Sequence, residues 1–128
     1  MNNIFKEKID VMHIKGSGWD MGSIDYPGLP AVELKPLLKT NKLKKLNDFD
    51  MVNLQRKCLI DSKSPNPSVE TLLHAFLPFK FVDHTHASAI LGLIDQPNDT
   101  EICKKVFGEK VGIVPYIIPG FDLSLIHI

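Results

Sequence analysis

Segments typical of β-strands alternate with segments typical of helices along this chain, and this alternation constrains the fold more than any other feature. The strand-like segments are rich in apolar and β-branched residues, and turns containing Gly or Pro follow several of them. The expected strands or extended pieces cover residues 9–15, 31–34, 79–86 and 111–118. Because strands that alternate with helices build sheets covered by helices, we expect a layered α/β domain.

The expected helices lie between these strands. Asn47 or Asp48 is a typical N-cap for a helix that runs to about residue 60, and Ser68 is a typical N-cap for a helix over residues 69–77. The other helical segments cover residues 35–46 (one irregular helix or two short ones), 87–94 and 99–107.

Length and charge limit the classes of function. The 128 residues are enough for one domain with a real core. Fifteen basic and fifteen acidic residues cancel, so neither nucleic acid nor an anionic membrane is expected as the main partner. The only dense basic cluster, within residues 39–45, is followed at once by two aspartates and is typical of a solvated helix face.

Several features indicate a cytoplasmic protein. Cys58 and Cys103 are isolated and form no metal-binding spacing, which is typical of reduced thiols. The N-terminus is charged and has no secretory signal. The apolar run at residues 89–94 is far too short to span a bilayer.

A His-x-His pair closes the expected strand at residues 79–86. On a strand, His84 and His86 project to the same side, because successive side chains alternate between the two faces. Two imidazoles so placed can bind one metal ion, and zinc is the commonest occupant of such sites. Histidines that merely form hydrogen bonds, in the core or on the surface, are the alternative.

Two further segments suit a bound anion. The loop at residues 15–18, Lys-Gly-Ser-Gly, offers backbone amides and a hydroxyl, although a plain tight turn has the same composition. Ser68 opens a helix, and Glu70 lies in its first turn. An acid at that position can instead serve only to stabilise the helix dipole.

The order of these motifs resembles the class II aldolase/adducin family, and within it the rhamnulose-1-phosphate aldolase type, which often precedes a short-chain dehydrogenase half. The segments that carry the resemblance are residues 15–20 (KGSGWD), 66–78 (NPSVETLLHAFLP), 81–87 (FVDHTHA) and 111–116 (VGIVPY). They occur in the family's order and are spread over residues 9–122.

The resemblance implies a role for each motif. His84 and His86 match two of the family's three zinc ligands, and Glu70 matches its acid/base carboxylate. Ser17, Gly18 and Ser68 match positions that hold the substrate phosphate. His74 also fits the pattern, but is expected to be a packed helix residue rather than a ligand.

The implied fold is a three-layer α/β/α domain with a central mixed, mainly antiparallel sheet. The implied reaction is reversible cleavage of a ketose 1-phosphate, rhamnulose 1-phosphate, to dihydroxyacetone phosphate and lactaldehyde, with Zn²⁺ as cofactor. The only partner expected besides this small phosphorylated sugar is a further copy of the chain, since family members generally assemble as homotetramers.

The chain also departs from the family pattern. The family's glycine-rich N-terminal loop should precede residue 1, and its third histidine should follow residue 128. Residues 1–122 are therefore expected to be a partial domain, incomplete at both ends and inactive alone. Residues 123–128 do not resemble the helix that the family places next and are expected to be an unmatched tail, so His127 is not assigned a metal.

Three alternatives remain. A fuculose- or ribulose-phosphate aldolase or epimerase, or a dehydratase, would share the same histidines. A metal-dependent hydrolase is disfavoured, because its Asp-x-His-x-His motif would need Asp at Val82 and its barrel about 250 residues. A non-catalytic adducin-like interaction domain would not be expected to keep Glu70 with both histidines.

Overall fold

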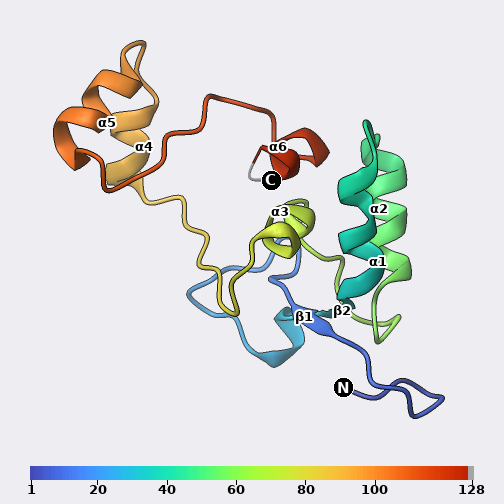
Figure 1. Ribbon diagram of the computed structural model, residues 1–128. Helices are drawn as coiled ribbons and strands as arrows, with labels where there is room; N and C mark the ends of the chain where they lie inside the picture. The colour runs from blue at the N-terminus through green and yellow to red at the C-terminus, as the bar shows by residue number, and fades with distance from the viewer. Residues whose placement is uncertain (127–128) are drawn as a thin grey trace. The chain divides into compact units, whose positions relative to one another are not determined.

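The computed structural model describes residues 1–126, and these divide into two compact units (Figure 1). Unit 1 is formed by Met1–Phe79 together with the chain from Ile117 onward, and unit 2 by Lys80–Tyr116. Each unit is described by itself below.

Unit 1 contains a two-stranded antiparallel sheet. Strand β1 (Val11–His13) pairs with β2 (Ala31–Glu33), and Met12 lies opposite Val32 in the register. The pair forms within the two extended segments expected at residues 9–15 and 31–34. With the helices around it, this sheet places the fold in the α/β class.

The helices of unit 1 follow local signals in the sequence. The expected helical segment at residues 35–46 forms two short helices, α1 (Leu34–Leu38) and the 3₁₀ helix η2 (Lys39–Lys42). Helix α2 (Asp48–Lys57) begins after the expected N-cap, Asn47. The Asn47 Oδ1 accepts a hydrogen bond from the Asp50 amide at 2.8 Å, which satisfies one of the helix's first amides.

Two helices and a turn complete unit 1. A 3₁₀ turn, η1 (Tyr26–Gly28), precedes β2, and α3 (Thr71–Phe76) precedes Pro78. Helix α3 begins two residues later than expected, with Glu70 rather than Ser68 at its N-cap position. A short helix, α6 (Phe121–Leu125), forms where the sequence did not indicate one.

The hydrophobic core of unit 1 joins the sheet to these helices. Helix α3 contacts both α1 and α6. The buried side chains of the core come from β-strands, helices and the segments beside them: Ile14, Val32, Leu37, Met51, Cys58, Leu72, Ala75 and Phe121. This core fixes the ends of β1 and α2 and the start of α3, which lead into the loops described below.

Unit 2 contains two helices that contact each other, α4 (Ser88–Ile94) and α5 (Asp99–Phe107). Both lie close to their expected bounds. Gly108 ends α5 with a φ of 62°, a conformation that glycine adopts without steric cost.

The strands expected at residues 79–86 and 111–118 are not formed. Both segments lack regular structure, and within residues 1–126 no backbone hydrogen bond joins either of them to a neighbouring strand. A β-branched, apolar segment becomes a strand only when a second segment pairs with it, so the local pattern alone was misleading here.

None of the helices in the described part of the chain is long and apolar enough to cross a membrane.

Candidate phosphate loops and imidazole pair

Two loops that are far apart in the sequence are joined edge to edge in unit 1. Gly16 and Pro67 form an isolated antiparallel bridge. On either side of this bridge, the Ser17 amide donates to the Asn66 carbonyl at 2.8 Å and the Ser68 amide donates to the Lys15 carbonyl at 3.0 Å. We call the segments 15–19 and 65–68 the paired loops. The pairing sets Ser17 opposite Asn66 and Ser68 opposite Lys15, so Ser17 and Ser68 belong to adjoining loops on the two sides of the bridge.

The pairing also limits which atoms of these residues can bind an anion. The amides of Ser17 and Ser68 already donate to carbonyl oxygens. The expectation of a loop with exposed amides therefore holds only in part. The groups that remain for an anion are the Ser17 hydroxyl and the Gly18 amide, on two exposed residues. Gly18 has a φ of 78°, a left-handed conformation that favours glycine.

The side chain of Lys15, which is partly buried, forms hydrogen bonds with two backbone carbonyls of the first loop. The Lys15 ammonium donates to the Trp19 carbonyl at 2.6 Å and to the Gly16 carbonyl at 3.2 Å. These contacts draw the loop's carbonyl oxygens toward the ammonium. They also place a positive charge close to Ser17 and Gly18, where it favours an anion.

The loop is also held by close packing around Gly28. The Gly16 amide donates to the Gly28 carbonyl at 2.8 Å. A Cβ atom built on Gly28 would lie 2.7 Å from the Trp19 ring and 2.8 Å from Ile24, so only glycine leaves room for the indole. The Trp19 ring thus fixes the paired loops against η1.

Glu70 lies beside the second loop. The Ser68 hydroxyl donates to Glu70 Oε2, and the Glu70 amide donates back to the Ser68 hydroxyl oxygen at 3.3 Å. Glu70 is half-buried. The predicted acid/base carboxylate and one predicted phosphate-binding residue are therefore neighbours in direct contact.

One residue of this site has no counterpart in the sequence-based prediction. Arg56, in the last turn of α2, donates from Nη1 to the side-chain oxygen of Asn66 in the second loop. No motif marked it, because its position on a helix surface is typical of an ordinary solvated residue. The one available signal was that it is the single arginine among fifteen basic residues.

In unit 2, the two predicted metal-ligating imidazoles face each other. The Nε2 atoms of His84 and His86 are 3.0 Å apart, and their ring centroids are 5.0 Å apart. The two rings are neighbours, although the strand from which a common side was expected is not formed. Both residues are exposed.

This geometry can be compared with the requirements of a metal ion. Two imidazole nitrogens bound tetrahedrally to one zinc at about 2.0–2.1 Å lie roughly 3.3 Å apart. The observed pair needs only a small outward movement to reach that separation. Within residues 1–126, however, no group of three or more His, Cys, Asp or Glu side chains is placed to hold a metal ion. A separation of 3.0 Å is also that of a hydrogen bond between the two rings, so zinc binding by the pair stays a prediction.

The remaining predicted residues divide between the units. Glu70 belongs to unit 1 and the imidazole pair to unit 2. His74 is half-buried on α3, one turn after Glu70, and its amide donates to the Glu70 carbonyl at 3.1 Å. His127 lies outside the described residues.

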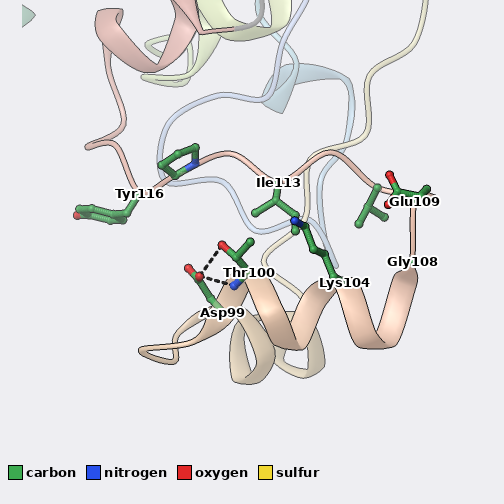
Figure 2. A pocket seen from close by; sticks show the side chains of 9 residues that line it. Asp99, Thr100, Lys104, Gly108, Glu109, Ile113 and Tyr116 are labelled. Carbon is green, nitrogen blue, oxygen red and sulfur yellow. Dashed lines mark hydrogen bonds between the residues drawn. The ribbon is translucent and has the colours of Figure 1, made fainter.

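Unit 2 also has a pocket of about 480 Å³ away from these residues (Figure 2). It lies between α5 and the segment that follows α5, and Lys104 and Ile113 are among its lining residues. At one edge, the Thr100 hydroxyl donates to Asp99 at 3.0 Å. None of the predicted site residues lines this pocket.

A family model and a solved structure both match this chain as a class II aldolase domain. The family described as "Class II Aldolase and Adducin N-terminal domain" matches residues 6–125. The chain is 38% identical to a solved structure, the N-terminal class II aldolase domain of a conserved protein from Thermoplasma acidophilum, with a TM-score of 0.89. That match covers 98% of this chain and 58% of the solved one.

A curated relative is longer than both this chain and the solved structure. The chain is 43% identical over 120 residues to a protein of Bacillus subtilis (strain 168) named the uncharacterized oxidoreductase YuxG. The match covers 91% of this chain and 17% of the relative, so the chain spans about a sixth of the relative's length.

Proposed function

The chain belongs to the class II aldolase and adducin N-terminal domain family, and on that basis we propose that it is part of a zinc-dependent aldolase. The proposed reaction is the reversible cleavage of rhamnulose 1-phosphate to dihydroxyacetone phosphate and lactaldehyde. The domain would adopt the family's three-layer α/β/α arrangement around a larger sheet. It would act in the cytoplasm and assemble as a homotetramer.

The observation that supports this proposal best is the joining of the paired loops next to Glu70. An aldolase that acts on a sugar phosphate needs an anion site and a proton-transferring group at a fixed separation. The contacts among Ser17, Asn66, Ser68 and Glu70 provide such a fixed arrangement within unit 1. The Ser17 hydroxyl and the Gly18 amide would bind the phosphate, and Ser68 would join them once its hydroxyl turns from Glu70. The Lys15 ammonium would favour the negative charge of the phosphate.

Glu70 is the proposed acid/base. Its carboxylate accepts a hydrogen bond from the Ser68 hydroxyl, so it is oriented before substrate binds. It would take the proton from the substrate hydroxyl as the carbon–carbon bond breaks and return a proton to the enediolate carbon.

His84 and His86 are the proposed zinc ligands of this chain. A bound zinc ion supplies Lewis-acid stabilisation of the negative charge that develops on the substrate oxygens. The 3.0 Å separation of the Nε2 atoms supports the role of the pair. A site with two protein ligands should hold zinc weakly, so full occupancy requires added metal.

The first prediction tests this function directly. The purified protein is assayed with rhamnulose 1-phosphate and added zinc, and release of dihydroxyacetone phosphate is followed by a coupled reduction. We expect no turnover of the chain alone and low turnover once zinc is added. Because proton transfer by a positioned side chain contributes about 10²–10⁴-fold, Glu70→Gln should lower turnover by at least 100-fold.

Glu101→Gln is the matched control, since Glu101 is exposed on α5 and lies outside the proposed site. Its turnover should equal that of the wild type. Turnover that survives Glu70→Gln would contradict the role of Glu70. Absence of both turnover and phosphate-ester binding would instead favour a non-catalytic, adducin-like interaction domain. Cleavage of fuculose or ribulose phosphate in preference would assign another substrate.

The oxidoreductase name of the Bacillus subtilis relative belongs to a protein of which this chain spans 17%. For this chain we propose the aldolase role, on the basis of its own Glu70, His84 and His86.

A further inference from the structure

We propose that Arg56 is a positioning residue that holds the paired loops in the geometry needed to bind the substrate phosphate. This inference rests on the proposed function, because it concerns the same phosphate site. Arg56 would act through Asn66 and not by contacting the phosphate itself.

A short series of hydrogen bonds connects helix α2, which packs against the core, to the predicted anion site. Arg56 Nη1 donates to Asn66 Oδ1, and the Asn66 carbonyl accepts from the Ser17 amide at 2.8 Å. Asn66 thus contacts Arg56 with its side chain and Ser17 with its backbone. A change in the position of Asn66 must move or break the bond that orients Ser17.

The two ends of this series of hydrogen bonds, Arg56 and the second loop, differ in how firmly the fold holds them. Arg56 lies on α2, and the neighbouring turns of this helix bury Met51 and Gln55, each only 2% exposed. The second loop has no helix or strand of its own, and Asn66 is exposed. Arg56 therefore links a segment with few buried contacts to an element that the core fixes.

The chemistry of the arginine suits this task. A guanidinium is planar and always charged, and its hydrogen bond to an amide oxygen is stronger than a bond between neutral groups. Lys15 provides the matching contact within the first loop. Each of the paired loops is thus held by one cation, and of the two cations Arg56 is the one that reaches its loop from a different element.

A double-mutant cycle tests the inference. Arg56→Gln, Asn66→Ala and the double variant are titrated with dihydroxyacetone phosphate, and the Ser17 and Gly18 amide signals are followed by NMR. Because the bond is exposed, we expect each single variant to bind about three- to tenfold more weakly. The double variant should bind no more weakly than the weaker single variant, since both remove the same link.

Lys57→Gln removes the same charge from the neighbouring exposed residue and should bind like the wild type. A second readout is hydrogen exchange at the Ser17 amide, which should become several-fold faster in Arg56→Gln and stay unchanged in Lys57→Gln. Melting temperatures establish that every variant is folded.

The outcomes separate this inference from the proposed function. Additive losses in the cycle would show that Arg56 acts on the phosphate directly and would overturn the positioning role, as would wild-type binding by Arg56→Gln. If the wild type binds no phosphate ester, the proposed phosphate site and Arg56's role in binding both fail. In that case the exchange rate of Ser17 still decides whether Arg56 holds the loop.

Discussion

At the residue scale, the fold changes the ionisation of the Cys58 thiol. Cys58 is buried in the core of unit 1 at 5% exposure. Burial raises the pKa of the Cys58 thiol, and the negative charge of Glu33 raises it further. Both effects disfavour the thiolate, so Cys58 is a packing residue rather than a nucleophile.

This raised pKa predicts a loss of stability at alkaline pH. Below the thiol pKa of the unfolded chain, about 8.5, the thiol is protonated in both states and its contribution to stability is complete. Above that value the unfolded state releases the proton more readily than the folded state, so the contribution falls as the pH rises. We expect Cys58→Ala to be destabilising at pH 7, and the difference from the wild type to shrink between pH 8 and 10.

Urea unfolding of both proteins across this pH range measures the difference. A difference that stays constant with pH would show that the thiol ionises equally easily in the folded and unfolded chains.

At the element scale, the packing of η1 against the first of the paired loops depends on one glycine. The Trp19 ring occupies the space where a side chain at position 28 would lie. The loop geometry proposed to bind phosphate therefore depends on a contact with η1, an element that contains none of the proposed site residues.

Gly28→Ala should destabilise unit 1 by about 1–3 kcal/mol, because the new methyl group must displace a rigid indole. It should also weaken binding of dihydroxyacetone phosphate, since Trp19 adjoins the loop. Gly92→Ala is the control. A Cβ at Gly92 meets nothing within 4 Å, and within α4 the change should be neutral or stabilising by up to about 1 kcal/mol. Chemical denaturation distinguishes the two, and equal stability of both variants would contradict the packing argument.

At the scale of the whole molecule, burial is distributed unevenly. The eight buried hydrophobic residues of the core cluster all belong to unit 1. In unit 2, Cys103 is the only described residue that is buried, and several large apolar side chains are exposed, among them Phe81 at 80% and Tyr116 at 87%.

This imbalance predicts different local stabilities. Amide hydrogens of α4 and α5 should exchange at least about tenfold faster than those of α2, because opening a unit with few buried contacts costs less free energy. Native-state hydrogen exchange read by mass spectrometry measures this ratio. Equal protection of the three helices would show that unit 2 is stabilised as strongly as unit 1.

Features that depend on neighbours along the chain could be predicted from the amino-acid sequence. The Asn47 cap placed the start of α2, and Gly108 placed the end of α5, because capping and positive φ are properties of a few adjacent residues. The order of the motifs along the chain also indicated the family.

Features that depend on partners distant in the chain emerged only from its three-dimensional packing. The segments at residues 79–86 and 111–118 have strand-like sequences but no paired neighbour within residues 1–126, so they are not strands. Local composition does not predict the bridge between Gly16 and Pro67 or the hydrogen bond between Arg56 and Asn66. The physical reason is the same in each case: a hydrogen bond between distant segments depends on how the whole chain packs, and no local pattern encodes it.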